Sequence, residues 1–81
     1  MARVVVRYFA AARSAAGASE DTVEADTVNG CLSIIVAMRG ADLQRVLKAC
    51  TLLVDGVAAH DLDRPLIGNV EIDVLPPFAG G

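Results

Sequence analysis

Pro76, Pro77, Gly80 and Gly81 are the residues whose types and spacing suggest chemistry. Two consecutive prolines donate no backbone N–H and fix φ near the polyproline value, so they end a strand and begin a stiff, extended spacer. The two glycines add no side chains, so this end could thread a narrow channel and bring a terminal carboxylate into a catalytic site. We therefore take the carboxylate of Gly81 as the candidate reactive group and expect Gly80 to provide clearance.

A period-two pattern precedes this tail. Apolar and acidic residues alternate from Val70 to Leu75, which is typical of a half-buried strand. We therefore predict a folded domain over residues 1–75 and an extended reactive tail over residues 76–81. A frayed end without function is the alternative, because chain termini are commonly poorly ordered.

The first third of the chain predicts a strand, a short helix and a second strand. The β-branched run within residues 3–9 predicts a strand, placed centrally because both of its faces are apolar. Residues 10–16 favour a short helix that ends at Gly17. Residues 20–25 favour an edge strand, whose acidic side chains discourage edge-to-edge pairing.

The middle of the chain predicts two helices. Thr27 is the expected N-cap of the main helix, whose apolar residues recur at helical spacing before Gly40 ends it. Gly30 lies inside this helix and weakens it, so an irregular first turn is expected. Asp42 is the expected N-cap of a further short helix with an apolar face from Leu43 to Cys50.

The last part of the chain predicts a hairpin and the final strand. Asp55–Gly56 is a favoured tight turn between strands over residues 52–54 and 57–59, and an irregular segment through Pro65 follows. Strands alternating with helices, and a last strand that rejoins the sheet, indicate an α+β fold of two layers.

Length and composition exclude several classes of protein. The 81 residues make one domain, without room for a buried substrate cavity of ordinary enzyme size. The net charge of −3 and the absence of a basic cluster disfavour nucleic-acid binding. Apolar runs such as Ile34–Met38 are far too short to span a bilayer, and no signal-peptide core is visible. We therefore expect a cytoplasmic protein that binds neither nucleic acid nor membrane.

The cysteines and the histidine are weaker candidates for chemistry. Cys31 and Cys50 fit no Cys-x-x-Cys spacing and lie in apolar surroundings, which predicts buried free thiols. A sulfur-carrying role for Cys50 is the alternative. His60 is the only histidine and is expected in a solvated loop, and these three residues have no recognised metal-ligand spacing.

Three segments resemble the MoaD/ThiS sulfur-carrier family. The ending Leu-Pro-Pro-Phe-Ala-Gly-Gly at Leu75–Gly81 resembles the ending of the family, and its diproline is most similar to the branch that serves molybdopterin synthase. Tyr8–Arg13 resembles the aromatic-Ala-x-x-Arg segment of the family, and Asp63–Leu66 resembles its Asp-x-Pro-Leu turn. The tail is the specific signal, and the other two segments support it.

The resemblance implies a fold and a reaction. The fold is a ubiquitin-like β-grasp, a mixed sheet of four or five strands on one main helix, with the first and last strands parallel. An E1-like adenylyltransferase would consume ATP to adenylate Gly81, and a sulfur-donor protein would supply the sulfur of a C-terminal thiocarboxylate. That thiocarboxylate would donate sulfur for the molybdopterin dithiolene. No bound cofactor and no catalysis by the chain alone are implied.

The resemblance also implies partners. The large subunit of molybdopterin synthase would receive the tail in a heterotetramer. The expected partner-binding residues are Phe9, Arg13, Leu75, Pro76, Pro77, Phe78 and Ala79. A core position for Phe9 and a solvent-facing role for Arg13 remain open at this point, whereas Phe78, beyond Pro77, is the expected docking anchor.

Three other functions compete. A sulfur carrier for thiamin thiazole or cysteine synthesis would share the activation step and use another acceptor. A ubiquitin-like protein modifier would form isopeptides through Gly81, although the single lysine, Lys48, leaves little scope for self-linked chains. An interaction module would not need its terminal carboxylate.

Overall fold

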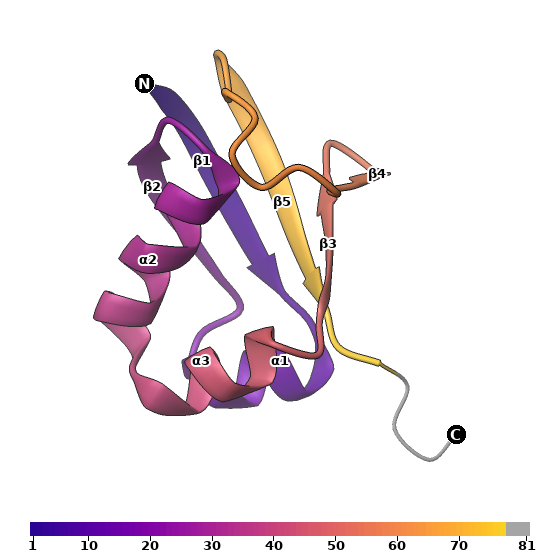
Figure 1. The fold of residues 1–81 in the computed structure, drawn as a ribbon. Coiled ribbons are helices and arrows are strands. Elements are labelled where there is room, and N and C mark those ends of the chain that lie inside the picture. The colour runs from indigo at the N-terminus through magenta and orange to yellow at the C-terminus, as the bar shows by residue number, and fades with distance from the viewer. Residues whose placement is uncertain (78–81) are drawn as a thin grey trace.

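Five strands form one sheet, and three helices lie on one side of it in the computed structural model, which describes residues 1–77 (Figure 1). The elements in chain order are β1 (Ala2–Tyr8), α1 (Ala10–Ala16), β2 (Glu20–Ala25), α2 (Val28–Arg39), α3 (Ala41–Leu47), β3 (Thr51–Val54), β4 (Val57–Ala58) and β5 (Asn69–Leu75). In this part of the chain, no helix is long and apolar enough to cross a membrane.

The first and last strands are parallel neighbours in the middle of the sheet. The strand order is β2-β1-β5-β3-β4, and every pair other than β1–β5 is antiparallel. Val4 lies opposite Val70 and Tyr8 opposite Val74, so both strands run toward the same edge of the domain. This mixed sheet, with α2 as its longest covering helix, is the ubiquitin-like β-grasp, with five strands and with two seven-residue helices beside the main one.

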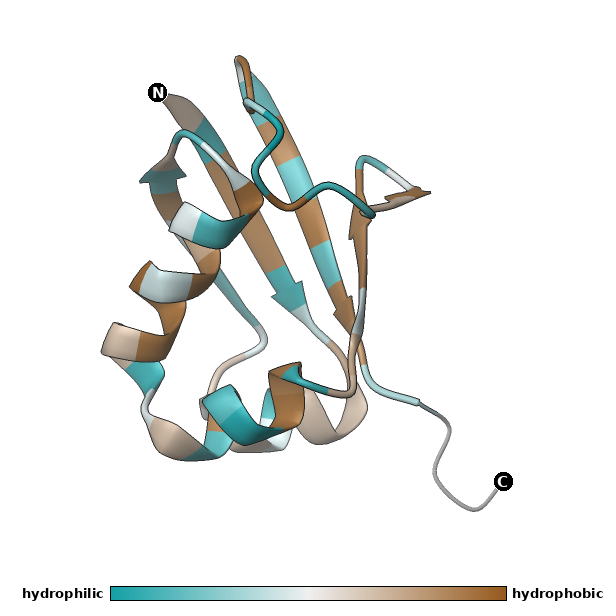
Figure 2. Ribbon diagram, in the orientation of Figure 1, coloured by the Kyte–Doolittle hydropathy of each residue, from teal (hydrophilic) through white to brown (hydrophobic). Residues whose placement is uncertain are grey.

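Only one face of the sheet is buried. Val4 and Val6 of β1 and Ile72 of β5 are fully buried beneath the helices, where Ile35 of α2 joins them. Figure 2 shows the resulting alternation of hydrophobic and hydrophilic residues along β5. The predicted central position of β1 is confirmed, but the reason for it was wrong. The other face of β1 is open and carries the exposed Arg3 and Arg7. A strand can therefore be central in this sheet although helices cover only one of its faces.

The capping of α2 is as predicted, whereas that of α3 is not. The Thr27 hydroxyl accepts a hydrogen bond from the Gly30 N–H at 2.9 Å, which confirms the N-cap. The first turn is regular, since the Cys31 N–H donates to the Thr27 carbonyl at 3.0 Å, so the irregularity expected at Gly30 is absent.

Asp42 was wrongly predicted as an N-cap: Gly40 occupies that position with φ of 100°, a conformation that favours glycine. Asp42 lies in the first turn of α3 and pairs with Arg45.

The hairpin turn is confirmed and also ties β3 to β5. Asp55 and Gly56 have φ values of 48° and 85°, as a type I′ turn requires. The Asp55 N–H donates to the Glu71 carbonyl at 2.8 Å, and the Asp55 carboxylate accepts from the Glu71 N–H at 2.9 Å. β4 is shorter than predicted, because only Val57 and Ala58 pair with β3.

A polar cluster joins β1, β2 and the end of α2. The Tyr8 hydroxyl donates to the Asp21 carboxylate at 2.8 Å, and the Arg39 Nε donates to the same carboxylate at 2.9 Å. The hydrogen bonds from Arg39 are the largest influence on Asp21 and hold the pKa of its carboxyl below the usual range. The cluster therefore favours folding most strongly when Asp21 is ionised.

We expect Asp21→Asn to lower the free energy of unfolding at neutral pH and to make that free energy less sensitive to acidification. A carboxyl whose folded pKa lies below its unfolded value of about 3.9 contributes stability above that value, and the contribution is lost as the pH falls through the folded pKa. The midpoint of urea unfolding should therefore fall less for Asp21→Asn than for the natural protein between pH 7 and pH 3. Glu24→Gln, which changes an exposed acid on the same strand, is the control. Equal acid sensitivity of the natural protein and Asp21→Asn would contradict this role.

Candidate functional site

The base of the tail lies beside the junction of β1 and α1. Leu75, the last residue of β5, is paired with Thr51 of β3, and the preceding Val74 carbonyl accepts a hydrogen bond from the Phe9 N–H at 3.2 Å. Leu75 and Pro76 are half-buried and Pro77 is exposed, so the chain leaves the sheet within these three residues. Figure 1 shows this exit at the yellow end of β5, near the end of β1 and the start of β3.

Phe9 adjoins this exit and is only half-buried. Its backbone is extended at the N-cap position of α1, and the next residue, Ala10, has φ of 50°, an uncommon conformation for alanine. The core of buried residues does not include Phe9. Its ring is therefore available for contact with a partner, and the core alternative is not supported.

Arg7 organises the open face of the sheet next to Phe9. Its guanidinium lies 5.4 Å from the centroid of the Phe9 ring, 3.3 Å from the Glu71 carboxylate and, through Nε, 3.6 Å from Asp73 Oδ1. Sequence reasoning missed Arg7 and Asp73 as site residues. The alternation of charged residues along each strand was visible, but only the parallel register places Arg7 opposite Asp73.

Asp73 Oδ1 keeps an unused capacity to accept a hydrogen bond. This atom is buried, and within residues 1–77 it has no hydrogen-bond donor, because Arg7 Nε at 3.6 Å is an ion-pair neighbour beyond hydrogen-bond distance. Because this oxygen is shielded from solvent, its charge is balanced by the neighbouring Arg7 guanidinium and not by a hydrogen bond. It lies two residues before Leu75, on the open face that leads to the tail.

Arg13 is exposed on α1, as its solvent-facing alternative predicted. Its Nε donates to the Tyr8 carbonyl at a long 3.4 Å, at the same end of β1 as Phe9. Within the described part of the chain, no carboxylate lies within 4.0 Å of its guanidinium. The guanidinium can therefore bind a carboxylate or phosphate of a partner in a bidentate manner.

The predicted residues thus divide into two groups. Phe9, Leu75, Pro76 and Pro77 are brought together around the exit of the chain from the sheet, with Arg13 nearby on α1. The other four predicted residues lie outside the described part of the chain; they are Phe78, Ala79, Gly80 and Gly81.

The remaining candidates have structural explanations. Cys31 is fully buried, and burial raises the pKa of its thiol to about 11. The half-buried Cys50 thiol donates to the Val46 carbonyl at 3.2 Å, and burial raises its pKa too, which disfavours the thiolate needed for sulfur chemistry. His60 is exposed in a loop, as predicted. Within residues 1–77, no group of three or more histidine, cysteine or acidic residues is arranged to hold a metal ion.

The residues around the exit therefore have the composition of a protein contact surface. An aromatic ring, apolar strand-end residues and two arginines surround the point where a stiff diproline leaves the sheet. Such groups bind and orient a partner.

Comparison with solved structures identifies similar chains. Small archaeal modifier protein 1 (SAMP1) from Haloferax volcanii is 26% identical with a TM-score of 0.84, and the similarity covers 98% of this chain and 99% of that one. SAMP1 from Methanosarcina acetivorans is also 26% identical, with a TM-score of 0.86 and coverage of 100% and 98%.

A chain from the complex of subunits 1 and 2 of the molybdopterin-converting factor of Helicobacter pylori shows the same fold. It is 23% identical with a TM-score of 0.73, and the similarity covers 98% of this chain and 99% of that one. No curated protein sequence matches the chain significantly.

The sequence matches the ThiS family over residues 6–81, which include all of the predicted partner-binding residues and the whole tail. The fold is that of ThiS/MoaD-like sulfur carriers and of ubiquitin-like modifiers such as SAMP1. Because the match spans nearly the entire sequence, the chain belongs to the ThiS family.

Proposed function

We propose that this chain carries sulfur as a thiocarboxylate on Gly81 and acts as the sulfur-carrier subunit of a molybdopterin synthase. The observation that carries this proposal is the family match, which extends through Gly80 and Gly81. The exit of β5 into Pro76–Pro77 supports it, because the tail begins clear of the sheet beside a surface suited to a partner. The similarity in fold to the molybdopterin-converting factor supports the choice of acceptor.

The terminal carboxylate must be activated before it can accept sulfur, because its negative charge repels nucleophiles. In the proposed reaction, a Gly81 carboxylate oxygen attacks the α-phosphorus of ATP on an E1-like enzyme, and pyrophosphate leaves. Sulfide delivered by a sulfur-donor protein then attacks the carbonyl carbon of the adenylate, and AMP leaves. The product is a thiocarboxylate, whose sulfur is the nucleophile in the large subunit of the synthase.

The residues of this chain position that carboxylate. Gly80 has no side chain, so the tail can pass through a narrow channel at this position. Pro76–Pro77 restrict the number of conformations that the tail must lose on insertion. Phe9 and Leu75 provide apolar contact at the base of the tail. We assign Arg7 as a positioning residue, because its guanidinium lies over the Phe9 ring and pairs with Glu71 and Asp73.

We expect Arg7→Gln to weaken docking without unfolding the domain. The Arg7 side chain is 44% exposed, so its ion pairs are screened and their loss should change the free energy of unfolding by no more than about 1 kcal/mol. The KM of the activating enzyme for the chain should rise several-fold, while kcat stays nearly constant, because Arg7 does not reach the reacting atoms. Arg45→Gln, which breaks a surface pair on α3, is the matched control. Equal KM values for both variants would argue against a positioning role.

Transfer to the acceptor tests the proposed pathway. The thiocarboxylated chain should be mixed with the large subunit of molybdopterin synthase and with precursor Z, and molybdopterin measured by its fluorescent oxidation product. We expect product in proportion to the thiocarboxylate consumed. A chain that is loaded with sulfur but yields no molybdopterin with an active large subunit would rule out this acceptor.

A ubiquitin-like modifier is the second candidate, and the similarity to SAMP1 favours it. The two SAMP1 chains have higher identities and TM-scores than the molybdopterin-converting factor chain. Both functions begin with adenylation of Gly81 and fail if one residue is added after it. Isopeptide conjugates in a reaction with lysine-bearing proteins, ATP and the E1-like enzyme would support the modifier, and their absence would support the dedicated carrier.

A further inference from the structure

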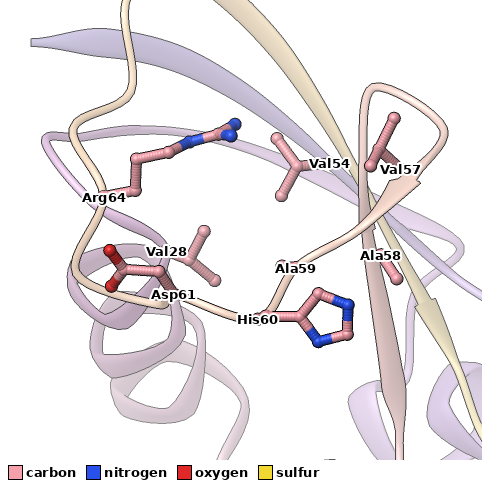
Figure 3. Close-up of a pocket in the computed structure, with 8 residues that line it drawn as sticks. All are labelled: Val28, Val54, Val57, Ala58, Ala59, His60, Asp61 and Arg64. Carbon is pink, nitrogen blue, oxygen red and sulfur yellow. The ribbon is translucent and has the colours of Figure 1, made fainter.

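Three adjoining hollows form an apolar trough on the helical side of the domain. The first, of about 320 Å³, lies between the start of α2, the β3–β4 hairpin and the following loop (Figure 3). The second, of about 460 Å³, lies over Cys50 and Leu62 and shares Ala59 and His60 with the first. The third, of about 530 Å³, lies between α2 and α3 and shares Leu32 and Leu47 with the second. We call this continuous depression the trough.

The floor of the trough is apolar and partly exposed. Leu32, Leu47, Ala59 and Leu62 pack on the core but remain half-buried, and Val57 at its end is 69% exposed. An apolar surface that crosses three elements and is open along its length suits the side chains of a peptide segment better than one enclosed small molecule.

The charges beside the trough indicate what it binds. Within residues 1–77, three of the seven basic side chains pair with acidic side chains, namely Arg7, Arg39 and Arg45. Lys48 and Arg64 line the trough, and across residues 1–77 neither has a carboxylate within 4.0 Å.

The single acidic residue that lines the trough forms no ion pair with either cation within residues 1–77. An oxygen of Asp61 accepts the Asp63 N–H at 3.0 Å, within its own loop. Figure 3 shows the Arg64 guanidinium extending over the first hollow toward Val54, while the Asp61 carboxylate points away from it. In a protein with a net charge of −3, this placement of unpaired cations along an apolar floor favours an acidic ligand.

We propose that the trough is a second docking site, which binds a partner segment that combines apolar side chains with carboxylates. The apolar side chains occupy the hollows, and the carboxylates pair with Lys48 and Arg64. The trough lies on the helical side of the sheet, whereas Arg7 and Asp73 face the open side. The trough reaches the base of the tail at Thr51, which lines the second hollow and pairs with Leu75.

Amide chemical shifts of the full-length chain test this proposal with two capped probe peptides. One alternates leucine with glutamate, and the other alternates leucine with lysine. We expect the acidic peptide to shift the amides of Leu32, Leu47 and Ala59, and to bind less tightly as salt is raised. Lys48→Glu and Arg64→Glu should each weaken this binding about fivefold.

Arg3→Glu is the matched control, because Arg3 is another exposed arginine without an acidic partner in residues 1–77 and it lies on the open face. It should change the affinity less than twofold. No shifts with the acidic peptide, equal shifts with the basic peptide, or shifts confined to the open face would each overturn the proposal.

Discussion

Gly80→Phe is expected to prevent loading of the chain with sulfur. The proposed mechanism requires the tail to enter a channel just wide enough for backbone, and an aromatic side chain next to Gly81 would hold the terminal carboxylate away from ATP. A displacement of this kind at a reacting group reduces rates by about 100-fold or more. The rate of ATP–pyrophosphate exchange by the E1-like enzyme and the intact mass of the chain after reaction with a sulfide source measure the two steps separately.

Ala41→Phe is the control for this variant. Ala41 is exposed in the first turn of α3, at the end of that helix away from β3, and it belongs neither to the tail nor to the residues around its base. Its rates should equal those of the natural protein. If Gly80→Phe is loaded as fast as Ala41→Phe, the carboxylate is not delivered through a narrow channel.

Among the substitutions proposed for this protein, Ile72→Ala is expected to lower the free energy of unfolding most. Ile72 is fully buried in β5, and its neighbours across the strands are Val6 of β1 and Val54 of β3, so both pairings of the central strand β5 meet on it. Truncating such a side chain removes buried apolar surface and leaves a cavity, at a loss of about 2–5 kcal/mol. Since a small domain has a total stability of about 5–15 kcal/mol, the variant should be marginally folded at 37 °C.

The same substitution at an exposed isoleucine is the matched control. Ile67 is 85% exposed in the segment before β5, so Ile67→Ala should change the free energy of unfolding by less than about 0.5 kcal/mol. Urea titrations followed by circular dichroism measure both. Similar midpoints for the two variants would mean that β5 does not form the centre of the core as described.

Local sequence signals predicted most elements, because they act within a few residues. The Thr27 cap, the Gly17 helix end and the Asp55–Gly56 turn each depend on backbone conformations or hydrogen bonds within one or two turns of chain. Asp42 was wrongly predicted as the N-cap because another local signal lies close to it. Its residue type fits an N-cap, but the glycine two positions earlier allows α3 to begin sooner.

The site was predicted in part, because its polar residues meet only through long-range pairing. Phe9 and Leu75 could be chosen from the family resemblance. Arg7, Glu71 and Asp73 could not, since residues 64 or more positions apart are joined by the register of β1 against β5. The apolar pattern of β1 also does not distinguish a strand buried on both faces from one whose second face carries an ion-pair cluster.

Intact mass spectrometry shows directly whether Gly81 carries sulfur. The purified chain should be incubated with ATP, a competent E1-like enzyme and a sulfide source, beside a chain that lacks Gly81. Sulfur carriage predicts that the full chain gains the mass difference between sulfur and oxygen and that the shortened chain gains nothing. No gain by the full chain, with an enzyme that loads another carrier in the same reaction, would mean that Gly81 does not carry sulfur.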